Sequence, residues 1–444
     1  MSSFQYRRCC MRLPALELRA KPDYDRFHDL RLFRNRMPHR PHLPHLLMPR
    51  WMLPLLLAGL ATLGPFSIDT YMPSFPAIGE SLNATPLQVQ QTLSVYLLAF
   101  GVMILFHGTL SDSFGRRPVI LVSLGMFALA SAGCVVSYDI NHLLFFRALQ
   151  GLSAGAGMVV GRAIIRDCYS GHQAQRLMSQ VTMIFGIAPA VAPIIGGWLH
   201  LWFGWHSVFV FLALLGVGLL GVSYRYLPET LPETERQPLH PIALLKRYRK
   251  VSADRRFLLL TAAVALNFAG FFLYIASAPV FVIHSLGLQE NQFAWLFVPG
   301  VSGVVAGAFL SGRMAGKVSP RITVGFGYLL MVGAATLNVA YNLSVPPAIP
   351  WAVLPIMLYS TGMSLAMPSI SLLVLDLHPA SRGLVASMQG FVQTMLNAVV
   401  AGVISPLLSP APIWLAWGMA GFVLLGGLVW LSYVHLYRAE LQHA

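Results

Sequence analysis

The chain has 444 residues, of which 56% are hydrophobic and only 10% are charged. Because a soluble domain has about 25% charged residues, this composition excludes an ordinary water-soluble enzyme, a disordered chain and a disulfide scaffold. Asp, Glu, Lys and Arg are all absent from 257–289, 322–375 and 383–437. A helix needs ~20 apolar residues to cross a bilayer, so we predict an all-α protein that spans the membrane many times.

The first segment, residues 1–47, differs from the rest of the chain. It is basic, contains scattered prolines and has no apolar run, so we predict a disordered tail. His39, His42 and His45 lack a cysteine or carboxylate partner, and we predict no metal site there. The loops after residue 50 carry enough basic residues to set the orientation. We therefore expect a chain that begins at Met48 to insert normally and to keep full activity.

Hydropathy, prolines and polar breaks together predict twelve membrane helices. We expect these helices to begin near Trp51, Leu87, Pro118, Asn141, Leu177, Trp205, Phe257, Gln292, Arg321, Pro350, Arg382 and Pro412. They fall into an N-terminal block (48–226) and a C-terminal block (257–437) of similar length, joined by an exposed, partly helical linker (227–256) and followed by a short tail (438–444). Two pseudo-symmetric six-helix bundles are the repeat architecture of a secondary transporter, with its site between the halves.

We interpret the net charge of +14 as a sign of how the chain is oriented in the membrane, and not as a sign of nucleic-acid binding. Of the 30 basic residues, all except Arg147 fall on the same side of the twelve-helix model. Cytoplasmic loops collect Lys and Arg, so both termini are predicted to be cytoplasmic.

Asp69 and Arg147 are the acidic and basic residues placed inside predicted helices. An ionisable group at membrane depth costs at least ~2.5 kcal/mol and is a functional candidate by default. Burial favours a neutral carboxyl group, whereas a nearby arginine favours the ionised form, so a cavity that opens and closes could switch Asp69 between the two. The alternatives are that Asp69 caps the outer end of its helix in water, and that Arg147 forms a structural ion pair or carbonyl clamp.

The loop between the second and third helices has a distinctive pattern, from Gly108 to Pro118. Gly108 and Gly115 permit a tight turn. Asp112 can accept hydrogen bonds from Arg116 or from the start of the eleventh helix, whose dipole favours a carboxylate. Breaking the second contact would free the two halves to rock.

The fifth helix carries glycines and prolines at close spacing: Gly186, Pro189, Pro193, Gly196 and Gly197. Small residues let helix backbones approach closely, and prolines bend a helix. This pattern favours a tight, bendable interface between the halves, with ordinary helix packing as the alternative.

Polar and aromatic side chains inside the predicted helices are candidates to line a substrate cavity. Gln389, Gln393 and Asn397 recur every four residues and share one helix face. The full candidate set is Tyr71, Tyr96, Gln150, Asn267, Tyr274, Gln389, Gln393 and Asn397. Each could instead form an interhelical hydrogen bond.

These motifs resemble those of the major facilitator superfamily. The loop 108–118, with Arg116 and Arg117, resembles its signature loop, apart from Ser113 where a basic residue is common. Residues 147–151 resemble the R-x-x-Q-G motif of proton-coupled members, and 192–197 the antiporter motif, with Ala192 in place of glycine. Residues 66–73 and 162–167 resemble the bicyclomycin/chloramphenicol-resistance (Bcr/CflA) drug-efflux branch.

The resemblance implies a drug exporter driven by protons through alternating access, with Arg147 tuning the protonation step and the fifth-helix motif sealing the pathway against leak. We expect small hydrophobic drugs, protons and lipid as its partners, a bacterial inner membrane as its location, a monomer, and no cofactor. The alternative is a proton-coupled importer of a small metabolite with the same fold. An enzyme is not expected, because the G-x-S-x-G pattern at 151–155 lies inside a predicted helix rather than after a strand.

Overall fold

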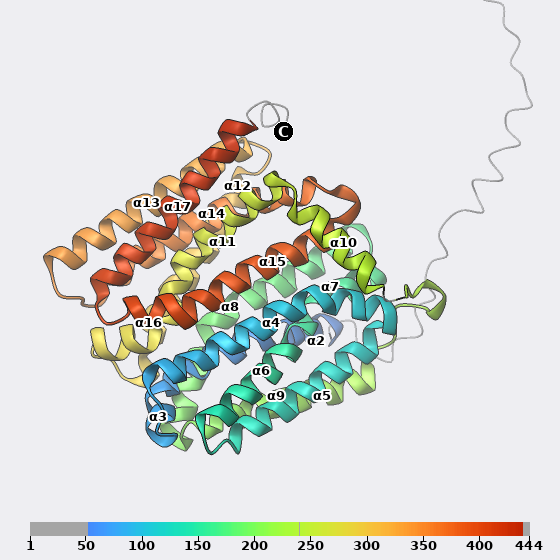
Figure 1. Cartoon of the computed structure of the whole chain (residues 1–444), viewed down its shortest axis with the longest axis horizontal. Helices are drawn as coiled ribbons and strands as arrows, with labels where there is room; N and C mark the ends of the chain where they lie inside the picture. The colour runs from blue at the N-terminus through green and yellow to red at the C-terminus, as the bar shows by residue number, and fades with distance from the viewer. Residues whose placement is uncertain (1–51, 239, 438–444) are drawn as a thin grey trace, which may run out of the picture. The chain divides into compact units, whose positions relative to one another are not determined.

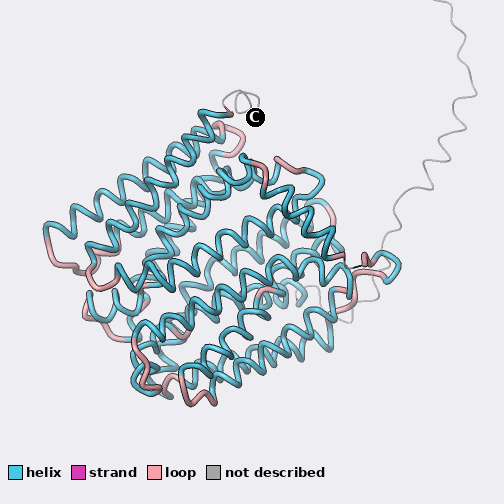
Figure 2. Tube along the Cα trace, in the orientation of Figure 1, coloured by secondary structure: helices cyan, strands magenta, loops and turns pink. Residues whose placement is uncertain are grey.

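The structure, a computed structural model, describes residues 52–238 and 240–437. Within these ranges the chain consists of helices joined by short loops, with no strand (Figure 2). The tail predicted at 1–47 and the short tail 438–444 lie outside the described residues. The prediction of an all-α fold is confirmed.

Twelve helical segments in the described ranges are long and apolar enough to cross a membrane. The first six are built from α2 (Met52–Asp69) with α3 (Phe75–Ser81), α4 (Pro86–Phe114), α5 (Arg116–Val135), α6 (Ile140–Ala154) with α7 (Ala156–Cys168), α8 (Gly171–Phe203) and α9 (His206–Tyr226). The last six are built from α11 (Arg255–Ala276), α12 (Ala294–Met314), α13 (Pro320–Ser344), α14 (Leu354–Asp376), α15 (Arg382–Val399) with α16 (Ser405–Leu408), and α17 (Pro412–Leu436).

The observed helices begin close to the predicted positions, with two larger differences. Helix α8 begins at Gly171 rather than near Leu177, because hydropathy detects only the apolar part of a helix that continues into polar residues. Helix α14 begins at Leu354, four residues after Pro350.

Each set of six helices packs mainly within itself. In the first set α4 lies against α6, α5 against α9 and α2 against α8, whereas α13 and α12 flank α14 in the second set. Small residues permit these close approaches: a Cβ atom on Gly157 or Gly303 would overlap a backbone carbonyl of the neighbouring helix. Figure 1 shows the two sets side by side, coloured blue to green and yellow to red.

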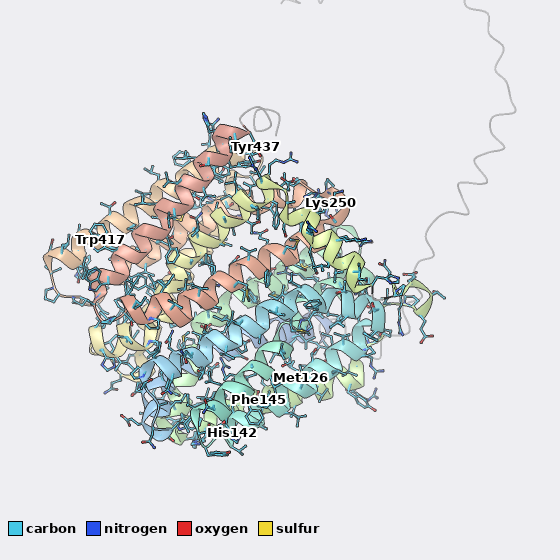
Figure 3. All side chains as sticks on the ribbon, in the orientation of Figure 1. Met126, His142, Phe145, Lys250, Trp417 and Tyr437 are labelled. Atoms are coloured by element: carbon cyan, nitrogen blue, oxygen red, sulfur yellow. The ribbon has the colours of Figure 1, made fainter. Side chains whose placement is uncertain are left out.

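Apolar side chains cover the outward faces of the helices, as a lipid environment requires. Phe145 and Trp417, both labelled in Figure 3, are 58% and 53% exposed. Leu129 and Val122 on α5 are 75% and 69% exposed. The described chain leaves more than half of each of these side chains uncovered, and they are therefore available to lipid tails.

Two hydrogen bonds between the two sets lie towards the ends of the helices opposite the basic loops, which is the predicted outer side, while α4 and α15 also touch near their middles, at Gly101 and Thr394. Gln90 on α4 donates from Nε2 to the carbonyl of Ala276 on α11 (2.9 Å). Ser94, one turn further along α4, donates from Oγ to the carbonyl of Ala398 on α15 (2.7 Å). These bonds close the outer ends of α4, α11 and α15 against one another.

The linker between the two sets is only partly as predicted. It contains helix α10 (Pro241–Ser252), which agrees with the expected helical content. Its first residues are not surface-exposed, however: Leu227 is 2% exposed, and the carboxylate of Glu229 binds the start of α5. The prediction of an exposed linker is wrong for this stretch, because the carboxylate of Glu229 accepts hydrogen bonds from backbone N–H groups of α5 and holds the stretch against the protein.

Candidate functional site

The first membrane span is broken beside Asp69. Helix α2 ends at Asp69, and a short 3-10 turn (η3, Met72–Ser74) leads into α3. Pro73 explains the break, because it has no N–H to donate to the Asp69 carbonyl and its ring would clash with that group. In transporters, broken helices of this kind occur near the binding site for substrate or coupling ions.

The side chain of Asp69 is buried without a partner. It is 3% exposed and forms no hydrogen bond or ion pair with any described residue. This burial does not fit the alternative in which Asp69 caps a helix end in water. An unpaired carboxylate in so buried a residue is costly unless it is protonated or gains a cation.

The guanidinium of Arg147 on α6 lies between two aromatic rings. Its central carbon is 4.1 Å from the ring centroid of Tyr71 and 4.4 Å from that of Tyr96. Arg147 is fully buried and donates one hydrogen bond to Oε1 of Gln150. Its Nε and second terminal nitrogen have no hydrogen-bond partner. The structural ion pair considered for Arg147 is not formed, and the positive charge is held by ring faces instead.

Neighbouring helices fix the two tyrosines and the glutamine. The Tyr71 hydroxyl is 3.2 Å from Oγ1 of Thr92 on α4, and the Tyr96 hydroxyl donates to the carbonyl of Gly64 on α2 (3.3 Å). Gln150 donates from Nε2 to Oγ of Ser131 on α5 (2.8 Å). Four spans therefore hold the cage around Arg147, and any displacement of this arginine must disturb their contacts.

The glycine pair of α8 joins this region to the other half of the protein. A Cβ atom on Gly196 would overlap the carbonyl group of Thr70, the residue after Asp69. A Cβ atom on Gly197 would overlap the carbonyl of Glu290, in the 3-10 turn (η6, Glu290–Gln292) that precedes α12. Pro189 and Pro193 lie within the same helix. One pair of small residues thus contacts both the broken first span and the second set of helices.

The signature loop is organised around Arg116. Its guanidinium donates from Nε to Oδ2 of Asp167 (3.1 Å), from NH1 to Oγ of Ser111 (2.7 Å), and also to Asp112. Of the two partners predicted for Asp112, Arg116 is therefore the one found, and no described contact joins Asp112 to the start of α15. Gly115 has φ of 100°, a conformation that favours glycine.

Sequence reasoning missed three residues that complete this loop. Both oxygens of Glu229 accept backbone N–H groups, from Arg116 (2.9 Å) and Arg117 (3.2 Å). Asp167, at the end of α7, also accepts from Oγ1 of Thr230 (2.9 Å). The sequence did offer a signal for them: Asp167 and Glu229 follow the fourth and sixth spans on the same predicted side of the membrane as the consecutive arginines Arg116 and Arg117.

The remaining cavity candidates are paired within the second set of helices. Asn338 donates from Nδ2 to the hydroxyl of Tyr274 (2.7 Å), Asn267 to the hydroxyl of Tyr328 (3.0 Å), and Gln389 to Oγ of Ser371 (2.9 Å). In this conformation they serve as interhelical hydrogen bonds.

Two candidates on α15 are less fully paired. Asn397 is 7% exposed, and its Oδ1 has no partner. Gln393 is half-buried. Contact between substrate and any of the eight candidates stays a prediction.

A small pocket that the sequence did not predict lies between α2, α7 and α8. Its lining is apolar apart from Arg162 and Thr182, and it includes Met158, Met178 and Phe185. On α2 it reaches Leu57 and Ala61, so it lies on the side of Asp69 that is predicted to be cytoplasmic. Over the described residues, no group of three or more His, Cys, Asp or Glu could hold a metal ion.

Comparisons with known proteins agree with this architecture. The chain is 32% identical over 266 residues to a bicyclomycin resistance protein homolog of Haemophilus influenzae, covering 60% of this chain and 66% of that protein. It is 28% identical over 355 residues to multidrug resistance protein D of Escherichia coli, covering 78% and 86%. A crystal structure of a bacterial homolog of the human lysosomal transporter Spinster has a TM-score of 0.67 at 16% identity, over 88% of this chain and 97% of that one.

The model of the Major Facilitator Superfamily matches residues 56–406. This match covers most of the twelve spans and includes Asp69, Arg147, the signature loop and the glycine pair of α8. The chain belongs to the Major Facilitator Superfamily, a family of membrane transporters.

Proposed function

We propose that this protein is a proton-coupled exporter of small hydrophobic drugs, of the Bcr/CflA kind, in a bacterial inner membrane. The observations that carry the proposal are the buried carboxyl group of Asp69, which has no partner among the described residues, and a caged, only partly hydrogen-bonded Arg147 in the same set of helices. The names of two relatives, for bicyclomycin resistance and multidrug resistance, support drugs as the substrate class.

Proton coupling follows from the free-energy cost of burying an ionised carboxylate at Asp69. A protonated Asp69 is neutral and can stay buried without a partner. Once ionised, it needs a cation, and we infer that the guanidinium of Arg147, which has two unpartnered nitrogens, moves to meet it. Reaching Asp69 would draw the guanidinium out of the rings of Tyr71 and Tyr96, which belong to the first and second spans. Protonation and helix packing are thereby linked.

Through the glycine pair of α8, a change in the protonation of Asp69 can alter how the two sets of helices pack against each other. The backbone of Thr70 contacts Gly196, and the adjacent Gly197 contacts the turn before α12. With the outer ends held together by Gln90 and Ser94, we infer that the structure represents an inward-facing state. Movement of the broken span upon loss of the proton would loosen this outer contact.

The pocket between α2, α7 and α8 has a volume of about 30 Å³ in this conformation, so it would have to widen to hold a drug, and we propose it as the place where the drug cavity opens. Its methionines and phenylalanine supply an adaptable apolar surface, and Thr182 and Arg162 supply polar contacts. Its place on the cytoplasmic side of Asp69 suits a substrate that enters from the cytoplasm or inner leaflet. This lining favours weakly polar, hydrophobic molecules over charged metabolites.

Everted membrane vesicles test the direction of transport. Each charge that moves down the membrane potential releases ~2.3 kcal/mol per 100 mV, which is enough to drive export. We expect vesicles made acidic inside to accumulate chloramphenicol only when they contain the protein, and a protonophore to abolish the uptake. A metabolite importer would instead release its substrate from such vesicles.

A further inference from the structure

The linker helix α10 crosses the cytoplasmic ends of the membrane helices. Figure 1 shows it running across the ends of α4 and α15, at a steep angle to both. Leu244, Tyr248 and Val251 share its inner face, and Val251 is 4% exposed. Tyr248 donates from its hydroxyl to the carbonyl of Leu105 on α4 (2.7 Å). Burial raises the pKa of Tyr248 to about 12, so this donor keeps its proton at neutral pH.

The opposite face of α10 carries apolar and basic side chains together. Ile242, Leu245, Lys246 and Arg249 follow helical spacing and share this face. Ile242 is 73% exposed and Leu245 is 68% exposed. With its inner face already fixed to α4, the helix presents these two large apolar side chains away from the protein.

The cations of α10 have no partners within the protein. Lys246, Arg247, Arg249 and Lys250 form no hydrogen bond or ion pair with any described residue, and the helix contains no acidic residue. Lys250 lies at the edge of the molecule in Figure 3. In contrast, Arg382, at the start of α15, is paired with Asp376 (2.7 Å). The excess positive charge on α10 is therefore available to an external anion.

The position of α10 along the chain places it at the membrane surface. It ends at Ser252, and the next membrane helix begins at Arg255. A helix with an exposed apolar pair flanked by lysine and arginine suits the boundary between headgroups and acyl chains. The cytoplasmic leaflet also carries a negative surface potential.

We propose that the outer face of α10 binds anionic phospholipid headgroups of the cytoplasmic leaflet. Lys246 and Arg249 contact the phosphates, and Ile242 and Leu245 enter the boundary with the acyl chains. Through the bond between Tyr248 and Leu105, the bound lipid is linked to α4, one of the helices that joins the two halves. This site does not depend on which substrate the protein transports.

Photo-crosslinking tests the proposal on the full-length protein. The protein is placed in nanodiscs that contain phosphatidylcholine and a small amount of photoactivatable phosphatidylglycerol, and crosslinked peptides are mapped by mass spectrometry. We expect crosslinks on residues 241–252, displaced by unlabelled phosphatidylglycerol but not by phosphatidylcholine or inorganic phosphate. Each cation near an anionic surface contributes ~1 kcal/mol, so the K246Q/R249Q variant should weaken lipid binding about thirtyfold.

A matched variant separates this site from general surface charge. Lys317 and Arg321 are also exposed and cytoplasmic, but they are not on α10, so K317Q/R321Q should leave the α10 crosslinks unchanged. Size-exclusion chromatography checks that both variants remain folded. Crosslinks that survive in K246Q/R249Q, or that phosphatidylcholine displaces equally well, would overturn the proposal. Displacement by a soluble acidic peptide at low concentration would also overturn it, since a protein partner would then account for the charge.

Discussion

Replacement of Arg147 separates a role of its charge in transport from a role in packing. The two ring faces around the buried guanidinium contribute up to ~2 kcal/mol each, whereas burying its charge costs at least ~2.5 kcal/mol. Arg147→Ala removes both, so we expect a net destabilisation of at most ~1.5 kcal/mol and a protein that still inserts. Arg147→Lys keeps the charge but cannot stack as a planar group on both Tyr71 and Tyr96, and should also lose about 2 kcal/mol.

Transport should nevertheless differ between these two variants. We expect a large loss with Arg147→Ala and a partial loss with Arg147→Lys, measured as chloramphenicol uptake by everted vesicles at matched protein levels, alongside thermal unfolding in detergent. Arg313 stacks on Phe309 at the surface (4.5 Å), so Arg313→Ala serves as a control that removes a similar contact without affecting transport. Normal transport by Arg147→Ala would refute the reasoning, and failure of that variant to insert would assign Arg147 to folding.

Three further predictions concern the elements around this site. Gly196→Ala should lower stability by ~1–3 kcal/mol through overpacking and abolish drug uptake. Gly186→Ala on the same helix should transport normally, because a Cβ atom there meets nothing within 4 Å. Equal uptake by the two variants would contradict the role given to the glycine pair. Glu229→Gln should weaken the cap on α5 and lower the stability of the protein by ~0.5–2 kcal/mol. Thermal unfolding measures this, with Glu233→Gln as an exposed control. An unchanged melting temperature of Glu229→Gln would count against the cap. A chain that begins at Met48 should insert and confer the same drug resistance as the full chain, and loss of resistance at equal expression would show that the preceding residues are needed.

The fold was predictable because hydropathy and charge act locally. Uncharged runs locate the spans, and basic loops locate one side of the membrane, without any knowledge of tertiary contacts. The first turns of α8, from Gly171, were missed because they are polar and give no hydropathy signal. The break at Asp69 was readable from Pro73, which removes a helix hydrogen bond, yet hydropathy treats the span as continuous.

The site was only partly predictable because its partners come from distant parts of the chain. Asp69 and Arg147 could be found as charges inside apolar helices. The cage around Arg147 could not, since Tyr71 and Tyr96 looked equally suited to a substrate cavity. Likewise, the local pattern identified Arg116 as important, but the carboxylate of Glu229 lies more than a hundred residues away in sequence, and only packing brings the two together.

The central claim is that Asp69 carries the proton exchanged for drug, and proton release measured directly tests it. Purified protein in lightly buffered detergent, with a pH indicator, should release protons when chloramphenicol is added. Asp69→Asn keeps the shape of the side chain but cannot titrate, so we expect it to fold and still bind drug while releasing no protons. Drug-dependent proton release by Asp69→Asn at the level of the unmodified protein would contradict the account.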